Sequence, residues 1–578
     1  MEPAAHPAPV LEGAATIGWR SHAVALQAAM TAEAGRPAAA GLAMAMDALA
    51  RADLAGALDG ARQALAADAA CAIAWRIAGL AHEGQGQMVE ALDAYQQAYA
   101  LDPQAPGVLA DLGRLARALD LHDAAVELLT LALAADPASP DLAHQLAAAL
   151  GDAHRYGEAV AVLQTALQIN PGDAFLWDGL GAVLLQRGDT PAALESFEQA
   201  LALGPDGAES AFHRAQARFE LGDAAGAEAD CDALLARLAP APPPAIRFLR
   251  SQARLTQGNL EGGWADYAAR LDPAYDKAPA FAVDGRLIEP GTDLEGRHVL
   301  VVGEQGVGDE MMFAGMIPDL IEAVGPQGRV HLAVSPRLVP LFARSFPAVT
   351  ATPYALSTVD GRPRLEAPGA AADLWIPLGQ LAALFRRERA RFDRAEGFLR
   401  PDPARVAHWR ARLDALGPGP RIGLTWRSMK TSSHRLKQYP RFEDWTPVFR
   451  LPGVRLVSLQ YGDCAEDIEA ARRLGADLWR PEGVDLTNDL DEAAAVSAAV
   501  DVAIGVGNAS VNLAGAVGTP AWIVGPPAAW PRLGTDHYPW FPRSRAFIAP
   551  SYGDWGPALA AAADAAAELA IAGAFRGA

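Results

Sequence analysis

Residues 171–205 read PGDAFLWDGLGAVLLQRGDTPAALESFEQALALGP, a stretch bounded by two prolines that lie 34 residues apart. The same register continues at other prolines and at alanines, namely Pro103, Pro137, Ala57, Ala91, Ala125, Ala159, Ala193 and Ala227. Proline ends a helix, and small side chains let two antiparallel helices pack closely. The register therefore predicts an array of helical hairpins, which must stack because a single hairpin cannot bury its own apolar face.

Glycine and aromatic residues share this register at Gly79, Gly113, Gly181, Trp75, Trp177, Tyr95 and Phe197. The pattern resembles the tetratricopeptide (TPR) repeat and predicts six repeats from about residue 38 to residue 241. The segment Gln257–Trp264, with Tyr267, predicts a last hairpin that caps the array. We expect an α-solenoid over residues 37–273. Its concave face is expected to bind a polypeptide and to include Arg76, Leu80, Arg114, Arg117, His144, Asp178, Phe212 and Phe219.

The composition narrows the class of protein. The chain has 578 residues, 51% of them hydrophobic, and a net charge of −21. A nucleic-acid binder needs a basic face to neutralise phosphates, so this charge argues against DNA or RNA as a partner. The three cysteines are scattered, which suits a reducing compartment. Neither a signal peptide nor a membrane-spanning run is apparent, and we expect a cytoplasmic protein.

The rest of the chain divides into segments that differ in composition and in the alternation of predicted strands and helices. Residues 1–36 are rich in Ala and Pro and are predicted to be partly disordered, and residues 274–296 predict a linker. From His298 onward, short β-rich runs alternate with helical runs, which indicates parallel sheets covered by helices on both faces. We predict two such α/β lobes, at 297–400 and 401–578, the second ending in a helix.

A cleft is expected between the lobes. The principal strands are predicted at 298–302, 329–334, 348–352, 373–376, 421–425, 454–458, 500–504 and 520–524. The stretch 353–372, with several Pro and Gly, predicts a loop or an insertion, and 309–323 predicts one helix. Open α/β sheets bind ligands outside the carboxyl ends of their strands, so we expect the ligand there.

The first motif of chemical interest follows the strand at 298–302 and reads GEQGVGDE over Gly303–Glu310. Gly306 and Gly308 permit a tight turn and leave room for a ligand, and Asp309 lies in the first turn of the following helix. Alone, this motif does not specify a ligand.

The second motif is Trp426-Arg427-Ser428, followed by Lys430 and Arg435. Several cations and hydroxyls in one loop after a strand favour an anion site, because arginine binds phosphate or carboxylate with two donors. The alternative is an exposed basic loop.

The third motif opens a helix of small residues and contains Asn508, Ala509, Ser510 and Asn512. The positive end of the helix dipole and the hydroxyl of Ser510 would suit a phosphate group. The alternative is a close-packed corner between strand and helix that needs small side chains.

Together, these motifs resemble the GT-B glycosyltransferases of the heptosyltransferase-like family 9, over roughly residues 297–566. A closer match is to the TPR-containing flagellin glycosyltransferases of alphaproteobacteria, which transfer nonulosonic acids such as pseudaminic acid. That match rests on residues 426–428, 459–463, 507–512 and 533–540. The resemblance implies a GT-B fold of two Rossmann-like lobes, an inverting and metal-independent transfer, and a protein acceptor, with flagellin favoured.

The donor site departs from family 9, whose last motif usually carries Asp and His where this chain has Gly507 and Asn512. The favoured co-substrate is a CMP-linked nonulosonic acid, whose phosphate and carboxylate Arg427 with Lys430 or Arg435 would neutralise. No other cofactor is expected. Two further donor contacts are expected at a strand end, with the edge of the core as the alternative role, at Gln460 and Tyr461.

The resemblance also assigns a base. Asp309 lies where heptosyltransferases have their proposed general base, which would deprotonate a Ser or Thr hydroxyl of the acceptor. Glu304 is the reserve candidate, and a helix cap is the alternative role of Asp309. Asp489-Leu490-Asp491 looks like a metal motif but opens a helix, where acidic caps are common.

Two rival functions fit the same residues. One is a glycosyltransferase that acts on a glycan or lipid carrier. The other is an inactive GT-B remnant that serves as a TPR scaffold, which the residues Gly507 and Asn512 favour. Nucleotide binding distinguishes both enzymes from the scaffold.

Overall fold

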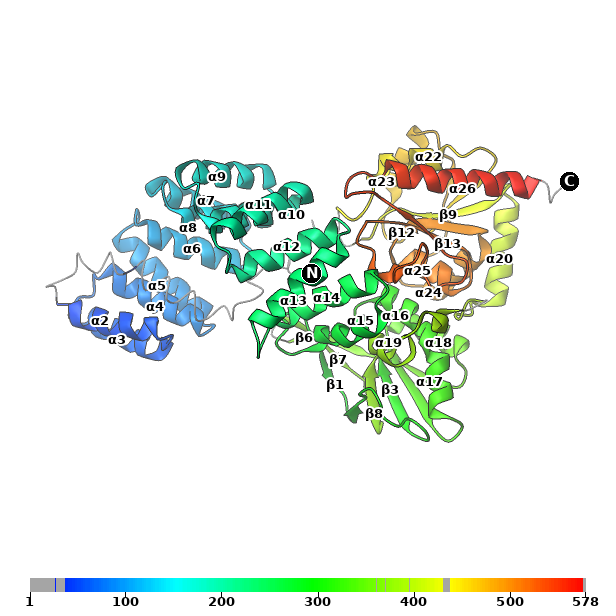
Figure 1. Ribbon diagram of the computed structural model, residues 1–578, viewed down its shortest axis with the longest axis horizontal. Helices are drawn as coiled ribbons and strands as arrows, with labels where there is room; N and C mark the ends of the chain where they lie inside the picture. Colours follow the sequence, from blue (N-terminus) through cyan, green and yellow to red (C-terminus); the bar gives the residue numbers. More distant parts are fainter. Residues whose placement is uncertain are drawn as a thin grey trace. The chain divides into compact units, whose positions relative to one another are not determined.

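The computed structural model describes residues 26, 37–359, 361–367, 369, 371–393, 396–429 and 437–574. The chain divides into two units, residues 1–217 and residues 218–578 (Figure 1). The predicted N-terminal segment 1–36, apart from Leu26, lies outside the described residues. None of the described helices is long and apolar enough to cross a membrane.

The first unit is built of helical hairpins, as the repeat register predicts. Its helices are α2 Ala39–Ala50, α3 Leu54–Ala67, α4 Ala72–Gly84, α5 Met88–Leu101, α6 Pro106–Ala118, α7 His122–Ala135, α8 Pro140–Asp152, α9 Tyr156–Ile169, α10 Ala174–Arg187, α11 Thr190–Leu203 and α12 Ala208–Glu220, the last of which runs into the second unit. Pro137 and Pro171 each lie just beyond the end of a hairpin's second helix. A Cβ atom on Gly181 would lie 2.5 Å from the ring of Phe197. The missing side chain of the glycine therefore leaves the space that the aromatic ring occupies.

The residues predicted for the concave face are mostly engaged within the array. Arg117 Nε donates to Asp152 of the next repeat at 2.5 Å, and Asp178 accepts from His213 Nδ1 at 3.1 Å. Arg76 and Arg114 form ion pairs with Asp111 and Glu83. The prediction that the apolar members contact a partner is wrong, because these side chains are buried, namely Leu80, Phe212 and Phe219.

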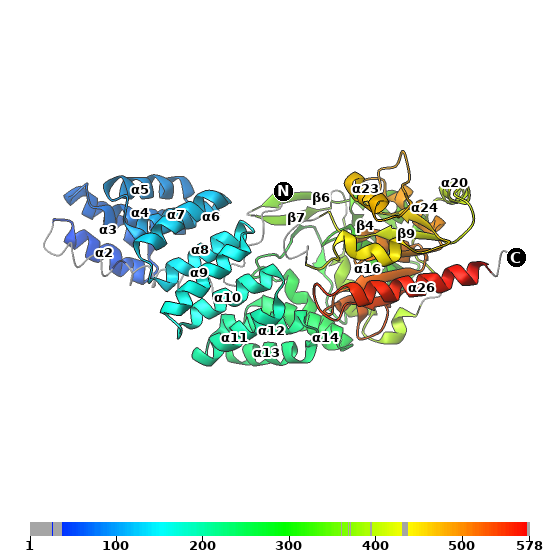
Figure 2. The same ribbon diagram turned by 90° about the horizontal axis from the view of Figure 1, so that it is seen from above.

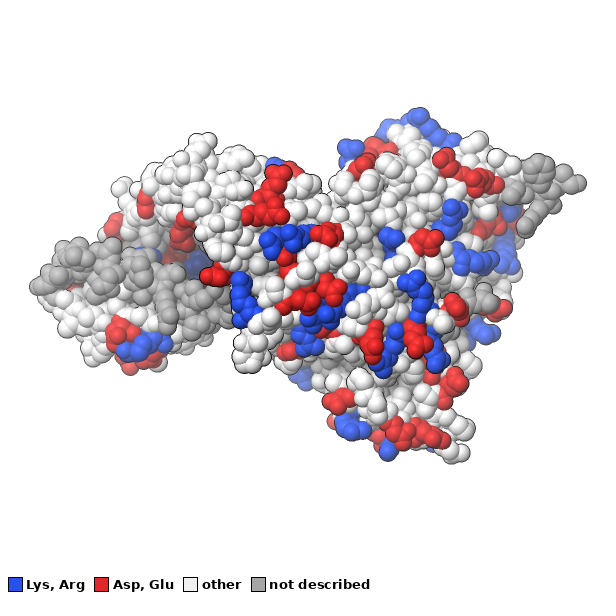
Figure 3. Space-filling view, viewed as in Figure 1, with Lys and Arg blue, Asp and Glu red and all other residues white. Residues whose placement is uncertain are grey.

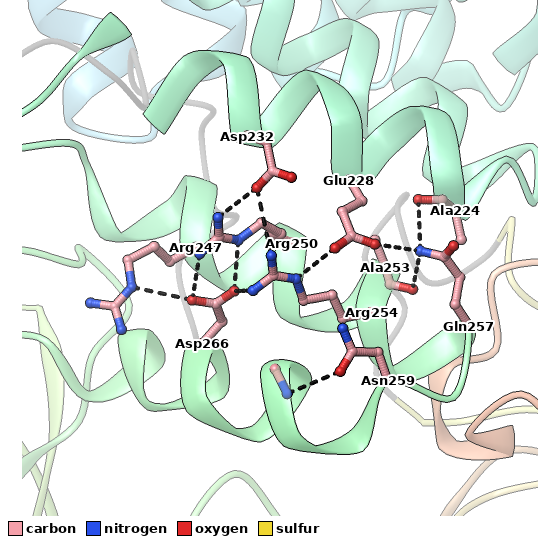
Figure 4. A network of polar contacts seen from close by, with 11 residues as sticks. Ala224, Glu228, Asp232, Arg247, Arg250, Ala253, Arg254, Gln257, Asn259 and Asp266 are labelled. Atoms are coloured by element: carbon pink, nitrogen blue, oxygen red, sulfur yellow. Dashed lines mark hydrogen bonds and ion pairs between the residues drawn. The ribbon is translucent and has the colours of Figure 1, made fainter. Parts of the chain in front are cut away.

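The array ends in the second unit with α13 Ala224–Arg237, α14 Pro244–Thr256 and α15 Leu260–Tyr267, followed by the turn Ala268–Leu271. Figure 4 shows how charge joins these helices around the buried carboxylate of Asp266. Asp266 accepts from Arg250 at 2.7 Å and 2.8 Å and from Arg254 at 2.8 Å. Arg254 also donates to Glu228 of α13 at 2.7 Å. The α14/α15 pair, which we call the cap hairpin, is the predicted last hairpin.

The other side of the cap hairpin enters the core of the α/β region. Trp264 is 1% exposed, its Nε1 donates to the carbonyl oxygen of Arg386 at 2.8 Å, and its ring meets that of Trp540 at 6.0 Å. Tyr267 packs on Phe313 in the same core. This packing explains why the second unit begins at residue 218 rather than after the predicted linker 274–296, which itself carries β1 Ala280–Ala282 and β2 Arg286–Leu287.

Five parallel strands form the first large sheet, in the order β2-β8-β3-β4-β5. Its other strands are β3 His298–Val302, β4 Arg329–Val334, β5 Thr350–Pro353 and β8 Leu374–Pro377. The predicted helix 309–323 is interrupted, as α16 Val307–Phe313, a 3-10 turn at Ala314–Met316 and α17 Ile317–Val324. Pro318 explains the interruption, because its ring clashes with the carbonyl four residues earlier in a continuous helix. The other helices are α18 Val339–Ser345 and α19 Ala382–Phe385.

For the stretch 353–372, predicted as a loop or an insertion, the loop alternative is wrong for most of the length, because two strands form there. β6 Ala355–Val359 and β7 Arg362–Glu366 pair antiparallel, and β7 pairs with β1 to give a small sheet in the order β1-β7-β6. Among the Pro and Gly of this stretch, Pro363 lies within a strand and Gly361 adopts φ +74° between the strands.

Six parallel strands form the second large sheet, in the order β11-β10-β9-β12-β13-β14. They are β9 Arg421–Thr425, β10 Arg455–Ser458, β11 Leu478–Trp479, β12 Val502–Val506, β13 Ala521–Gly525 and β14 Arg545–Ile548. The accompanying helices are α20 Pro403–Asp414, α22 Thr446–Phe449, α23 Ala465–Arg473, α24 Leu490–Ala499, α25 Ala509–Ala516 and α26 Gly556–Ala574. The apolar side of α26 shares one core with β9, β12 and β13 (Figure 1).

Charges are interspersed on the surface of the second unit. On the face drawn in Figure 3, acidic and basic side chains alternate over this unit rather than gathering by sign. The net charge of −21 is therefore not collected into one acidic patch on that face.

Candidate functional site

The two glycine-rich turns, one from each large sheet, lie against each other. The first follows β3 and begins α16, and the second follows β12 and begins α25. Asn512 Nδ2 donates to the carbonyl oxygen of Gly308 at 3.1 Å. A Cβ atom on Gly308 would lie 3.3 Å from the Cα atom of Ala509, so the two turns approach closely at this glycine. Both turns lie at carboxyl ends of parallel strands, the usual place for a ligand.

The first turn is held from behind by the end of the cap hairpin. Gln305, which adopts φ +69°, bonds through its amide to the hydroxyl of Tyr267 at 2.9 Å. Burial raises the pKa of Tyr267, and the nearby carboxylates of Glu304 and Asp309 raise it further. Asp309 is only partly exposed and lies in the first turn of α16, as predicted from its position after the glycines.

Glu304, the reserve base, is used by the fold. Its side chain is 1% exposed and forms an ion pair with Arg270, and its Oε1 accepts from the backbone N–H of Gly379 at 3.2 Å. A carboxylate enclosed in this way does not face an acceptor hydroxyl. The geometry therefore argues against Glu304 as a base and makes it the anchor of Arg270.

Sequence reasoning missed Glu310, which follows Asp309 directly. It is fully buried, and accepts from the backbone N–H of Ser335 at 2.9 Å and from the hydroxyl of Tyr354 at 3.0 Å. Burial raises the pKa of Glu310 to about 7. The signal in the sequence was an acid that directly precedes an apolar run, Met311–Phe313, which a helix buries.

The second large sheet contributes a loop organised by Gln460, which is 1% exposed. Its Oε1 accepts from the backbone N–H groups of Trp426 at 3.0 Å and Arg427 at 3.2 Å, and its Nε2 donates to the carbonyl oxygen of Arg427 at 3.0 Å. Trp426 is buried at 2% and donates from its ring to Asp467 at 2.9 Å. Gln460 and Trp426 therefore shape this loop, and the geometry argues against their predicted role as donor contacts.

Arg427 is the predicted donor-binding cation whose side chain the structure describes. It donates from Nε and Nη2 to Asp467 at 3.0 Å and 2.8 Å, with 30% of its side chain exposed. An anionic ligand would have to share Arg427 with this carboxylate. Beside it, the hydroxyls of Ser428 and Tyr461 lie 3.1 Å apart. The other predicted cations, Lys430 and Arg435, lie outside the described residues.

The start of α25 is tied to the same loop. Asn508 caps the helix by accepting from the backbone N–H of Val511 at 3.2 Å, and its Nδ2 donates to the carbonyl oxygen of Arg427 at 3.1 Å. Ser510 Oγ donates to the carbonyl oxygen of Leu459 at 2.8 Å. The predicted residues of the second and third motifs are thus brought together, with Asn508 and Ser510 holding backbone.

The acidic pair at the start of α24 has local partners. Asp489 accepts from the backbone N–H of Glu492 at 2.9 Å, and Asp491 pairs with Arg344. Among the described residues, no group of three His, Cys, Asp or Glu side chains is arranged to hold a metal ion.

Comparison with known proteins identifies relatives of the chain. The tetratricopeptide repeat model matches residues 42–106 and 179–243. Protein FlbA of Caulobacter vibrioides is 41% identical over 506 residues, which cover 86% of this chain and 84% of that protein. Identity at that level over most of both chains places the two proteins in one family.

Solved structures match the repeats. A tetratricopeptide repeat protein from Parabacteroides merdae is 19% identical, with a TM-score of 0.35, and covers 39% of this chain and 89% of its own. A thermophilic TPR protein from Thermus thermophilus is 24% identical, with a TM-score of 0.29, and covers 32% of this chain and 100% of its own. At these scores the likenesses carry no argument about function.

Proposed function

We propose that this chain, which belongs to the family of Protein FlbA, is a protein O-glycosyltransferase with a GT-B architecture. It would transfer a sugar from a nucleotide-sugar, with a CMP-linked nonulosonic acid favoured, to a Ser or Thr hydroxyl of a protein acceptor, with flagellin favoured. The TPR repeats support a polypeptide partner, because this repeat serves protein–protein interaction.

The observation that carries the proposal is the contact between Asn512 and Gly308. It brings two glycine-rich turns, at carboxyl ends of two separate parallel sheets, to one place. Helices that begin at such turns direct backbone N–H groups and the positive ends of their dipoles toward a bound phosphate. Two α/β lobes that meet in this way are the arrangement expected of a GT-B enzyme.

The chemistry follows from the partly exposed carboxylate in this place. The acceptor oxygen would bond to the anomeric carbon as the bond from that carbon to the phosphate oxygen breaks. The proton of the acceptor hydroxyl passes to Asp309, and the nucleotide leaves with the electron pair. The negative charge of the leaving nucleotide would be neutralised by Arg427 and by the start of α25. To reach the nucleotide, Arg427 would have to exchange its bond to Asp467 for one to the ligand.

The test is the intact mass of secreted flagellin from cells with and without the protein. We expect a fixed mass increment on each modified residue that disappears when the protein is removed. We also expect Asp309→Asn to lower transfer about 10²-fold or more while nucleotide binding is retained. Equal flagellin masses would reject flagellin as the acceptor, and normal transfer by Asp309→Asn would reject the base.

The inactive scaffold is a second candidate, which the ion pair of Arg427 with Asp467 favours because the cation already has a partner. Thermal unfolding with CMP, UDP, GDP and dTDP species separates the two. Stabilisation by one of these nucleotides supports the enzyme, because a ligand that binds only the folded state raises the unfolding temperature. No stabilisation by any of them supports the scaffold.

A further inference from the structure

The edge strand β6, at residues 355–359, is exposed along its whole length. All five of its residues are exposed, including 64% of Leu356. Its neighbour in the sheet, Leu365 of β7, is 4% exposed and packs on Leu300 and Val302 of the first large sheet. The small sheet therefore packs on the first large sheet through β7, and β6 is an outer strand of the small sheet (Figure 2).

The pairing of β6 decides which of its backbone groups face outward. Thr358 lies opposite Pro363, which has no N–H to exchange, so this is a non-hydrogen-bonded pair. Because the two kinds of pair alternate along an antiparallel ladder, Leu356 also turns its N–H and C=O groups away from β7. Within the described residues, no further strand pairs with this outer edge.

The strand lacks the usual protections of a free edge. Natural edge strands are guarded by charges, proline or bulges, which keep other chains from pairing with them. Residues 355–359 read ALSTV, without a charged residue or proline, and they pair with β7 in unbroken register. Such an edge is a template for an extended polypeptide, because its alternating donors and acceptors match another strand.

The edge starts beside the candidate site. Tyr354, the residue before β6, bonds through its N–H to the carbonyl oxygen of Val334 at 3.0 Å. Its hydroxyl donates to Glu310 at 3.0 Å, and Glu310 follows Asp309 in α16. A strand added to β6 would thus have one end next to the first glycine-rich turn.

We propose that the outer edge of β6 binds an extended segment of the acceptor polypeptide as an added strand, and that this segment leads a Ser or Thr hydroxyl toward Asp309. The identity of this polypeptide as the acceptor, and the delivery of its hydroxyl, rest on the proposed function; the pairing of an extended polypeptide with this edge does not. A second copy of this chain is a poor occupant, because pairing over five residues buries far less than the roughly 1,200 Å² of a stable interface.

The test measures binding of overlapping, fluorescently labelled peptides that tile flagellin, with the full chain and without nucleotide-sugar. We expect at least one peptide to bind, and Thr358→Pro to weaken it about tenfold, since one outward donor is lost while no bond to β7 is broken. The control Thr358→Val keeps the N–H and should bind as the wild type does. Thermal unfolding checks that the proline variant is folded.

A second measurement protects the test against a misfolded variant. N-methylation along the bound peptide should weaken binding at every second residue, because only alternate N–H groups of an added strand face β6. No binding peptide, equal affinity for Thr358→Pro, or uniform tolerance of N-methylation would overturn the proposal. Self-association of the wild type that Thr358→Pro abolishes would assign the edge to a second copy and overturn it as well.

The arms distinguish the two proposals. Binding that depends on β6 without any sugar transfer would reject the proposed enzyme and retain the added strand. Transfer to flagellin that is unaffected by Thr358→Pro would retain the enzyme and reject the added strand. Protection of the Leu356 amide in the free chain that is lost on removing residues 1–36 would make the chain's own N-terminal segment the occupant.

Discussion

The hairpins of the first unit and the cap hairpin share one repeat pattern but pack against different partners. The former pack on one another, and the latter packs into the core of the α/β region. In the first unit, glycine and alanine let helices close on aromatic side chains of the same hairpin, as Gly181 does with Phe197. Polar residues there join one repeat to the next, as Arg117 does with Asp152. The cap hairpin and the turn that follows it instead insert Trp264 and Arg270 among the α/β elements. A hairpin of the repeat type can therefore be part of the domain that it adjoins.

The largest expected effect comes from cutting on either side of this boundary. Removing residues 1–217 should leave a second unit that unfolds cooperatively, because its core is complete. Removing residues 1–273 also removes Trp264 and Tyr267, and should abolish cooperative unfolding. The predicted linker at 274–296 would place the longer cut outside the α/β lobes, and the contact of Trp264 with Arg386 changes that expectation. Circular dichroism during heating measures the unfolding of both fragments. Equally cooperative unfolding of the two would contradict the conclusion that the cap hairpin belongs to the core of the second unit.

The next test is the buried ion pair between Glu304 and Arg270, which lies in the turn after the cap hairpin. Arg270→Met leaves Glu304 charged and enclosed, which should lower the free energy of unfolding by about 4 kcal/mol. Adding Glu304→Gln should restore much of that loss, since the uncompensated charge is gone. Chemical denaturation of the single and double variants gives both values. A single variant as stable as the wild type would show that the cap does not depend on this pair.

Glu310 should make the stability of the second unit depend on pH. Its pKa is raised to about 7 in the folded state, so the carboxyl keeps its proton after the unfolded chain has lost it. The stability that it contributes is complete below its unfolded pKa and is lost as the pH rises through about 7. Glu310→Gln should remove this dependence. Between pH 4 and pH 8, the difference in free energy of unfolding between variant and wild type should therefore shift by about 3 kcal/mol in favour of the variant. Denaturation midpoints of both proteins at both pH values check this shift. If the stability of wild type and variant changed equally with pH, the burial of an acid at this position would be contradicted.

The smallest effect is expected in the first unit. Arg117→Met removes an ion pair whose arginine side chain is 26% exposed, which should cost about 1 kcal/mol. Arg117→Lys, which keeps the charge, is the control. A loss as large as that of Arg270→Met would mean that pairs between repeats and the pair in the cap are equivalent.

The fold was predictable where side-chain volume repeats at a fixed spacing. The prolines and glycines of the array placed the hairpins, because each residue type has one steric role that recurs. The strands of the large sheets were predictable as apolar runs. β6 was missed because its residues are exposed on both faces and show no alternation, and because Pro363 indicated a loop although it tolerates its place in β7.

The candidate site was predictable in position and less so in the roles of its residues. Gly306 and Gly308 marked the first turn, and Gly308 lies where the backbone of Ala509 approaches closely. Whether a polar side chain faces a ligand or holds a loop depends on partners far away in the chain. Gln460, which organises the Arg427 loop, and Glu304, which anchors Arg270, are the examples.

If the two glycine-rich turns form one nucleotide-sugar site, a bound nucleotide must protect the backbone of both. Hydrogen–deuterium exchange of the full chain with and without CMP, and then with UDP, GDP and dTDP species, tests it directly. We expect one of these ligands to slow exchange in residues 304–309 and in residues 507–512 together. Slowed exchange in only one of the two turns, or in neither with any of the nucleotides, would contradict it.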